Sequence, residues 1–274
     1  MPAISTNTAA NAAVRYLNVN SQQETSALSK LSSGSRITSA SDDAAGLAIS
    51  TRISSDVTTL QQAATNASQA TSILQTADGG ASNISDILAR MKSLASESAS
   101  GTVTDSSRTY INSEFSQLSS EIDSIASGTR YSSQSLLDGS SSFASGVSVL
   151  VGSSASDTIT ITLSSLTASS LGVTSLDVST QSGATSALTA LDTAIDTVSA
   201  ARADIGAQES RFNFSADSIS TQTQNLQSAN SAIKDVDIAA EQATLSSAEV
   251  KTQAAVSAET AANQMPQYLL KLLG

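Results

Sequence analysis

The chain has 274 residues, with no cysteine, no histidine, no tryptophan and only 3% aromatic residues. The lack of cysteine excludes a disulfide framework and thiolate metal sites, and the lack of histidine removes the commonest general base and transition-metal ligand. A net charge of −11 disfavours binding to nucleic acid or to an anionic membrane. We therefore expect a structural protein, not an enzyme, with no cofactor and no metal.

The same composition favours long helices over a thick globular core. Ser and Thr together number 86, and no proline lies between Pro2 and Pro266 to interrupt a helix. Long helices bury only a narrow apolar stripe, which needs few large side chains. No apolar run approaches the roughly 18 residues of a membrane span, and the first 30 residues lack a basic start followed by an apolar stretch. We expect neither membrane insertion nor a cleaved signal peptide.

Two helices are predicted in the first part of the chain. The first covers 5–33, with apolar residues at helical spacing: Ala10, Ala13, Val14, Leu17, Ala27, Leu28 and Leu31. Residues 34–41 break the pattern. The second helix follows, with Ser39 or Ser41 as its candidate N-cap. Its seam contains Val57, Leu60, Ala64, Ala67, Ala70, Leu74 and Ala77. Asp78-Gly79-Gly80 is expected to end or loosen it.

Asp42 and Asp43 fall in the expected first turn of that second helix. A helix N-terminus carries partial positive charge and unpaired N–H groups, so carboxylates are favoured there. A carboxylate pair for acid–base or metal chemistry is the alternative. Consecutive helical residues point about 100° apart, however, and no third carboxylate lies near them in the sequence. We interpret the pair as helix-start residues.

Two further helical segments and a different middle follow. The third segment carries Ile84, Ile87, Leu88, Met91 and Leu94, and the fourth carries Ile111, Phe115, Leu118, Ile122 and Ile125. From about 132 to 183 the chain is rich in Ser and Gly. It contains two short alternating runs, Val147-Val149-Val151 and Ile159-Ile161-Leu163, which predict two strands.

The strongest periodicity covers 188–233, where steps of three and four sustain a heptad seam. The seam positions are Leu188, Leu191, Ile195, Val198, Arg202, Ile205, Glu209, Phe212, Ala216, Ile219, Thr223, Leu226, Asn230 and Ile233. This repeat predicts a long coiled-coil-like helix, packed at least in part within the same chain. Its polar positions either fix the register between partners or are solvated. A last helix is predicted at 238–264, followed by an apolar tail.

The expected fold is therefore mainly α, with long antiparallel coiled-coil-like helices formed by both chain ends and a small β-rich insert in the middle. Residues 1–42 and 234–274 are expected to form one discontinuous domain. Residues 43–140 and 185–233 are expected to form a helical rod, and 141–184 to form the insert.

Both chain ends resemble bacterial flagellins. The stretch Leu31–Ser50, LSSGSRITSASDDAAGLAIS, closely resembles their N-terminal signature. The segments 231–237 and 262–273 resemble their C-terminal signature, and Arg90 to Ala95 with Glu114 resemble their rod segment. The resemblance covers about 1–140 and 185–274, with both ends in the right order.

The resemblance implies a subunit of the flagellar filament that is exported unfolded by the flagellar type III apparatus and works outside the cell. It implies an inner coiled-coil layer, a rod and an outward-facing insert. It implies contact with further copies, with hook-junction and cap proteins, and with an export chaperone on the C-terminal segment. The side chains expected to pack the inner layer are Leu17, Leu28, Leu31, Val256, Met265, Leu269, Leu270, Leu272 and Leu273. The alternative within the same superfamily is a hook–filament junction protein.

Two recognition sites are also implied. Arg90, Leu94 and Glu114 resemble flagellin positions that make subunit contacts and bind innate immune receptors of animals. We expect an arginine, an apolar knob and a carboxylate in one surface patch. The plain alternative is a surface arginine beside a seam leucine. Residues 29–50 resemble the peptide sensed by plant receptor kinases, and the matching positions are Leu31, Gly34, Arg36, Ile37, Asp42, Asp43, Gly46 and Leu47.

Overall fold

The computed structural model describes residues 6–273, and side chains throughout that range except those of Pro266 and residues 269–273. The helices are α1 (Thr8–Ser33), α2 (Ala44–Ala99), α3 (Asp105–Gly128), α4 (Ser142–Ser145), α5 (Gln181–Lys234) and α6 (Ile238–Leu273). The strands are β1 (Arg130–Tyr131), β2 (Gln134–Ser135), β3 (Val147–Leu150) and β4 (Thr158–Ile161). The expected mainly α fold with a small strand-containing middle is confirmed. The chain divides into two compact units, residues 56–224 and residues 1–55 with 225–274.

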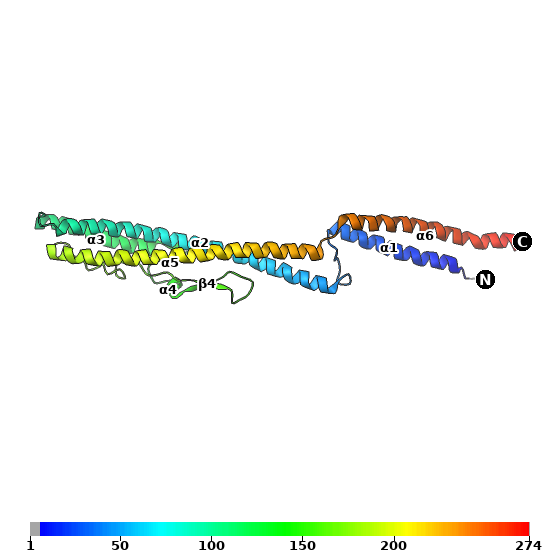
Figure 1. Ribbon diagram of the computed structural model, residues 1–274, viewed down its shortest axis with the longest axis horizontal. Helices are drawn as coiled ribbons and strands as arrows, with labels where there is room; N and C mark the ends of the chain where they lie inside the picture. The colour runs from blue at the N-terminus through cyan, green and yellow to red at the C-terminus, as the bar shows by residue number, and fades with distance from the viewer. Residues whose placement is uncertain (1–5, 274) are drawn as a thin grey trace. The chain divides into compact units, whose positions relative to one another are not determined.

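In the unit of residues 56–224, α2, α3 and α5 lie side by side (Figure 1). Their facing stripes form a continuous core. Its members include Leu74, Leu88 and Met91 of α2, Phe115 and Ile122 of α3, and four α5 residues at intervals of seven: Leu191, Val198, Ile205 and Phe212. Ile219, seven residues further on, is also buried. The heptad seam predicted for α5 is therefore confirmed over this unit. Its exact sevenfold spacing keeps one face of the helix against its neighbours.

The predicted break at Asp78-Gly79-Gly80 is wrong, because α2 continues through it to Ala99. Packing overrides the low helix propensity of glycine here. A Cβ atom on Gly80 would lie 2.4 Å from Oγ1 of Thr129 and 2.9 Å from Cδ1 of Leu137. Gly80 thus lets the chain that follows α3 approach α2 closely. A Cβ on Gly79 would meet open space.

Polar seam residues pair α5 with α2. The Arg202 guanidinium donates to both carboxylate oxygens of Asp78, at 2.8 and 3.3 Å. This interaction raises the pKa of Arg202. Nε2 of Gln75 donates to Oε1 of Glu209 at 2.9 Å, and Lys92 forms an ion pair with Asp192. The two helices are antiparallel, so residue numbers fall along one as they rise along the other. These pairs favour one antiparallel register.

Two hairpins and an irregular strap lie between α3 and α5, and the second hairpin and the strap belong to the insert. The predicted strands appear as β3 and β4, which pair antiparallel with Val147 opposite Ile161. No alternating run of residues located the hairpin β1–β2, which precedes the insert. Its two-residue turn places Ser132 and Ser133 at positive φ, where sequence signals usually involve Gly or Asn. Residues 162–180 then run as an irregular strap with a tight turn at 167–173. Its buried apolar side chains are Leu163, Leu166, Ala168, Leu171, Val173 and Val178.

Five helix side chains bind the backbone of the insert. One of them is Ser98 of α2, whose Oγ donates to the carbonyl of Val178. Asn66 of α2 donates to the carbonyl of Leu150 at 3.2 Å. Asn112 and Asp123 of α3 accept from the N–H groups of Val178 and Ala168, at 3.0 and 2.8 Å. Gln208 of α5 both accepts from the N–H and donates to the carbonyl of Thr162, each at 2.9 Å. These bonds satisfy backbone groups that no strand or helix partner satisfies.

In the other unit, α1 and α6 pair in antiparallel fashion (Figure 1). Asn7 caps α1 by accepting from the N–H of Ala10, and its Nδ2 donates to the carbonyl of Ala262. At the other end of α1, Lys30 lies 4.0 Å from Glu241. The buried residues of the two helices are alanines, with Leu245 as the one large side chain among those described: Ala13, Ala27, Leu245, Ala248, Ala255 and Ala262. Helix α6 extends beyond the predicted end at 264 to Leu273.

Candidate assembly and recognition surfaces

The structure brings Arg90 and Glu114 together. Helix α3 returns antiparallel to α2 after the short loop at 100–104, and this places the two side chains opposite each other. Nε and Nη2 of Arg90 both donate to Oε1 of Glu114, at 2.9 and 2.6 Å, and both side chains are about half exposed. The pair is a charged surface feature that spans two helices.

Leu94 does not join that pair at the surface. Its side chain is 2% exposed and belongs to the hydrophobic core with Met91 and Ala95. The expectation of an exposed apolar knob beside Arg90 is wrong, because the seam that places Leu88 and Met91 inside the unit also places Leu94 there. The sequence itself predicts this burial, since Leu94 lies on the apolar stripe of its own helix. A role of Arg90 and Glu114 in recognition stays a prediction.

The segment that resembles the plant-sensed peptide, residues 29–50, contains the folded connection between α1 and α2, which we call the joint. Gly34 ends α1 in the left-handed conformation, with φ of 69°, and Leu31 is half-buried. Ser35 forms an isolated antiparallel bridge with Asp235. The Arg36 side chain donates from Nη2 to the carbonyl of Ile233 at 2.8 Å, and so caps the C-terminal end of α5. Ile37 is buried.

The two carboxylates of this joint have different tasks. Oδ2 of Asp42 accepts from the N–H groups of Ser39 and Thr38, and these bonds lower the pKa of Asp42 from 3.8 to about 2. Oδ1 of Asp43 accepts from the N–H of Gly46 at 2.8 Å. Asp43 is therefore the N-cap of α2, and the expected Ser39 or Ser41 cap is wrong. Asp43 precedes Ala44, the first helical residue, so its carboxylate reaches the third N–H of the helix.

Gly46 and Leu47 follow in the first turn of α2. Gly46 is buried, and a Cβ there would lie 2.4 Å from Oδ2 of Asp43 and 2.8 Å from Cδ1 of Ile37. Leu47 is half-buried. Most of the peptide-like residues are therefore engaged in holding the joint.

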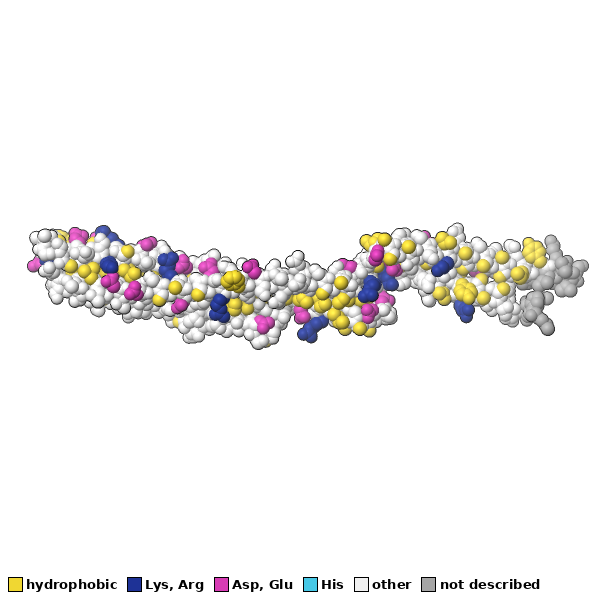
Figure 2. All heavy atoms as spheres, viewed as in Figure 1, with side chains coloured by type: hydrophobic (Ala, Val, Ile, Leu, Met, Phe, Trp, Pro, Cys, Tyr) yellow, Lys and Arg dark blue, Asp and Glu magenta, His cyan; other side chains and the backbone are white. Residues whose placement is uncertain are grey.

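The expected inner-layer residues are poorly covered within one chain. Leu17 is half-buried, while Leu28, Val256 and Met265 are exposed, at 58%, 48% and 63%. The side chains of Leu269, Leu270, Leu272 and Leu273 lie outside the described residues. Further large apolar side chains that α1 and α6 expose are Val14, Tyr16, Val19, Ile238, Val250 and Tyr268. Figure 2 shows hydrophobic side chains gathered on the visible face of these helices.

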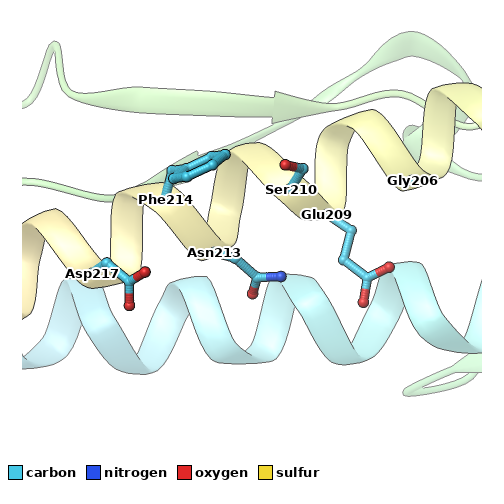
Figure 3. A pocket seen from close by; sticks show the side chains of 6 residues that line it. All are labelled: Gly206, Glu209, Ser210, Asn213, Phe214 and Asp217. Carbon is cyan, nitrogen blue, oxygen red and sulfur yellow. The ribbon is translucent and has the colours of Figure 1, made fainter.

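Two exposed aromatic residues of the other unit were missed from the sequence. Tyr110 of α3 and Phe214 of α5 are 76% and 73% exposed, and both lie off the predicted seams. Phe214 borders a shallow hollow of about 260 Å³ with Gly206, Glu209, Ser210, Asn213 and Asp217. In Figure 3 Phe214 points away from α2, whereas Glu209 and Asn213 point toward it. A large aromatic outside a helix seam is the signal that finds such residues.

Metal-binding clusters and membrane-spanning helices were sought in the part of the chain that the structure describes. Within residues 6–273, no three or more acidic side chains gather in an arrangement that could hold a metal ion. Within the same residues, no helix combines the length and apolarity needed to cross a bilayer. The features to be explained are helix surfaces, and the fold is mainly α, with α1 and α6 paired in one of its two units.

The chain belongs to the bacterial flagellin family. Residues 4–142 match the bacterial flagellin N-terminal helical region, and residues 188–273 match the C-terminal helical region. A flagellin of Halalkalibacterium halodurans is 35% identical over 261 residues, which cover 94% of this chain and 95% of the relative. A flagellar filament 30.7 kDa core protein of Treponema maltophilum is 34% identical, with coverage of 94% and 95%.

Solved structures agree with the family. The crystal structure of Bacillus cereus flagellin aligns with a TM-score of 0.52 and 29% identity, over 61% of this chain and 94% of that one. A putative flagellar hook-associated protein of Vibrio parahaemolyticus aligns with a TM-score of 0.58 over 71% of this chain and all of that one, but at 14% identity. The second likeness shows the fold alone. The family assignment makes this chain a structural protein of the bacterial flagellum.

Proposed function

We propose that this chain polymerises into the flagellar filament through its α1–α6 pair. The observation that carries the proposal is the row of large apolar side chains that α1 and α6 expose, among them Val19 and Val250. Contiguous exposed apolar surface marks a site of association. Within one chain the pair buries mainly alanines, so further copies would supply the missing cover. Contacts between unlike surfaces then build an open helical polymer.

Substitution of one exposed valine tests this proposal. Val250→Asp adds a charge to the exposed face of α6 without touching the core of residues 56–224. We expect loss of sedimentable filaments with unchanged helical content by circular dichroism. Val250→Leu keeps the surface apolar and serves as the matched control. Filaments of normal length and yield from Val250→Asp would refute assembly through this face.

A hook–filament junction protein of the same superfamily is the second candidate, since such proteins share the terminal helices of flagellins. Negatively stained images of the purified wild-type chain distinguish the two. Long filaments formed by this chain alone support the filament subunit, whereas short or absent polymers support the junction protein.

The filament proposal also includes a division into three regions and a role without catalysis. Residues 1–42 with 234–274 would form the inner layer, residues 43–140 with 185–233 the rod, and 141–184 the outward-facing insert. The proposed role is wholly structural. An enzymatic role would require a constellation of reactive groups, and the residues that border the Phe214 hollow suggest none.

Export and extracellular location are also proposed. The resemblance to flagellins supports unfolded export through the flagellar type III apparatus, with a chaperone on the C-terminal segment until export. The exposed apolar side chains of α6, such as Val250 and Val256, suit such a chaperone. Co-purification of the full chain with the chaperone, and its loss on removal of 245–274, checks this. Hook-junction and cap proteins are proposed as the partners at the two filament ends.

Immune recognition is proposed at two places. The exposed Arg90–Glu114 pair would contact the animal receptor, and Arg90→Ala in a reporter-cell assay on monomer tests it. The plant-sensed segment is folded into the joint by Arg36, Ile37 and Asp43. A receptor that reads this segment as an extended peptide would respond to a synthetic 29–50 peptide and not to the folded chain.

A further inference from the structure

Two large apolar side chains stand out on the surface of residues 56–224. Tyr110 of α3 and Phe214 of α5 are 76% and 73% exposed. Every other large apolar side chain of this unit, all of which the structure describes, is buried or half-buried. Aromatic side chains supply much of the energy of protein interfaces, because they bury a large area and lose little conformational freedom. The surroundings of the two rings show what each can bind.

Tyr110 lies beside the pair of Arg90 and Glu114. It precedes Glu114 by four residues on α3, so the two side chains share one face of that helix. Arg90 reaches Glu114 from α2 through Nε and Nη2, which leaves Nη1 outside the pair. We call Arg90, Tyr110 and Glu114 the tyrosine patch. It presents an aromatic ring with a phenol O–H and a guanidinium as donors.

The Phe214 hollow, of about 260 Å³, is a depression along one stripe of α5. Gly206 and Ser210, which have little or no side chain, lie two turns and one turn before Phe214. A Cβ atom on Gly206 would have no neighbour within 4 Å, so the depression opens outward. Its charged lining residues are both acidic: Asp217, and Glu209, whose Oε1 already bonds α2. Phe214 and Glu209 point to opposite sides of α5 (Figure 3). The hollow therefore offers an aromatic ring, space and carboxylate acceptors.

We propose that the tyrosine patch of one copy docks in the Phe214 hollow of a second copy. The occupant is a second copy because the two surfaces are complementary and lie on the same chain. A ring meets a ring, and the donors of Tyr110 and Arg90 meet carboxylates. Two different surfaces that fit each other are what an open head-to-tail polymer requires. The inference rests on the proposed filament and adds a contact between its copies outside the α1–α6 pair.

The places of the two surfaces along the unit set the offset between copies. The ion pairs that join α2 to α3 and to α5 give the register of the antiparallel helices. In that register Tyr110 lies near the level of Leu94 and Phe214 near that of Asn66. At 1.5 Å per residue the two levels are roughly 40 Å apart. Parallel copies joined by this contact are therefore staggered by roughly 40 Å, and each copy leaves one surface open for the next.

Cysteine cross-linking tests the contact, because the natural chain has no cysteine. Ser113 and Ser210 are exposed and lie within about one turn of Tyr110 and Phe214. Sedimented filaments of Ser113→Cys with Ser210→Cys, oxidised and run on a denaturing gel, should give a ladder of cross-linked oligomers. Either cysteine alone should leave the monomer. Ser124→Cys with Ser210→Cys is the matched control, because Ser124 is exposed on the same face of α3 about 17 Å further along.

Loss of either ring gives a second measurement. Tyr110→Ser and Phe214→Ser should each raise the concentration needed for filament growth about tenfold, with urea unfolding unchanged. The double variant should lose no more than either single variant, since both remove the same contact. Filaments that sediment but give no band above the dimer overturn this contact and leave the filament proposal standing. Multiplied losses in the double serine variant overturn it too. A wild-type chain that forms no filament overturns both proposals.

Discussion

Residues 56–224 and the α1–α6 pair are built from similar long helices, yet they place their large apolar side chains in opposite ways. In residues 56–224, leucine, isoleucine and phenylalanine of α2, α3 and α5 are turned inward, and Phe212 and Leu191 are fully buried. In the α1–α6 pair the buried positions are mostly alanine, while Leu28, Val250 and Tyr268 face outward. Residues 56–224 bury their large apolar side chains within a single chain, whereas the α1–α6 pair leaves side chains of the same kind exposed.

The difference follows from the number of neighbours each helix has. In residues 56–224, three helices and the strap surround one interior, so the apolar positions of each heptad are buried against a neighbour. Two helices alone cover only one narrow stripe of each other. Helices that bury little surface are marginal in water. The comparison therefore predicts unequal local stability.

Amide hydrogen exchange of the monomer should show the largest contrast. Amides in the buried stretch of α5 around Val198 should open only with global unfolding, whereas those of α1 and α6 should open locally. The rates should differ by about a thousandfold or more, given the usual range of global stability. Equal protection in both regions would show that the α1–α6 pair is stable without further copies.

A pair of phenylalanines on α5 probes the core directly. Phe212→Ala removes a fully buried ring and should destabilise residues 56–224 by about 3–5 kcal/mol in urea unfolding. Phe214→Ala, two residues further on, removes an exposed ring and should change stability by less than about 0.5 kcal/mol. Similar losses from both would contradict the burial described for α5.

A pair of adjacent glycines on α2 should respond with opposite signs. Gly80→Ala pushes a methyl group against Thr129 and Leu137 and should cost about 1–3 kcal/mol. Gly79→Ala meets open space and should stabilise α2 by about 0.5–1 kcal/mol, because alanine favours helix. Thermal unfolding of the two variants gives the sign at once. Stabilisation by both would mean that the chain after α3 does not pack on Gly80.

Asp42 gives the smallest effect, confined to the joint. Its pKa is lowered in the folded state, so its contribution is present above pH 3.8 and is lost as the pH falls through about 2. Wild type and Asp42→Asn should therefore differ in joint stability near neutral pH and converge toward pH 2. Carboxyl chemical shifts in NMR titration report the pKa. A midpoint at the ordinary value of 3.8 would show that Thr38 and Ser39 do not hold the carboxylate.

The sequence was most informative where one period ran for many turns. Leu191, Val198, Ile205, Phe212 and Ile219 could be placed inward because a sevenfold repeat leaves a helix one possible buried face. The strap could not be predicted, since irregular chain has no period of its own and its burial depends on the helices it crosses. Gly79-Gly80 misled because local propensity is weak against tertiary packing.

The candidate sites were predicted unevenly for a similar reason. Arg90 and Glu114 could be paired from the antiparallel return of α3, and their bond is present. The resemblance to flagellins placed Leu94 at the surface, whereas the apolar stripe of its own helix predicted burial. The structure agrees with the stripe, since Leu94 is buried. Asp43 rather than a serine caps α2 because the boundary of the helix lies two residues later than the pattern indicated.

The way in which the helices hold the insert sets what the insert can carry. The hydrogen bonds from helix side chains to the insert all go to backbone groups, which every residue except proline provides in full; the side chains are Asn66, Ser98, Asn112, Asp123 and Gln208. These hydrogen bonds depend on the course of the backbone and not on the identity of the side chains. Outward side chains between 147 and 161 can therefore be exchanged as long as that path is kept. The same helices offer a ready frame for displaying foreign peptides in place of the turn at 152–157.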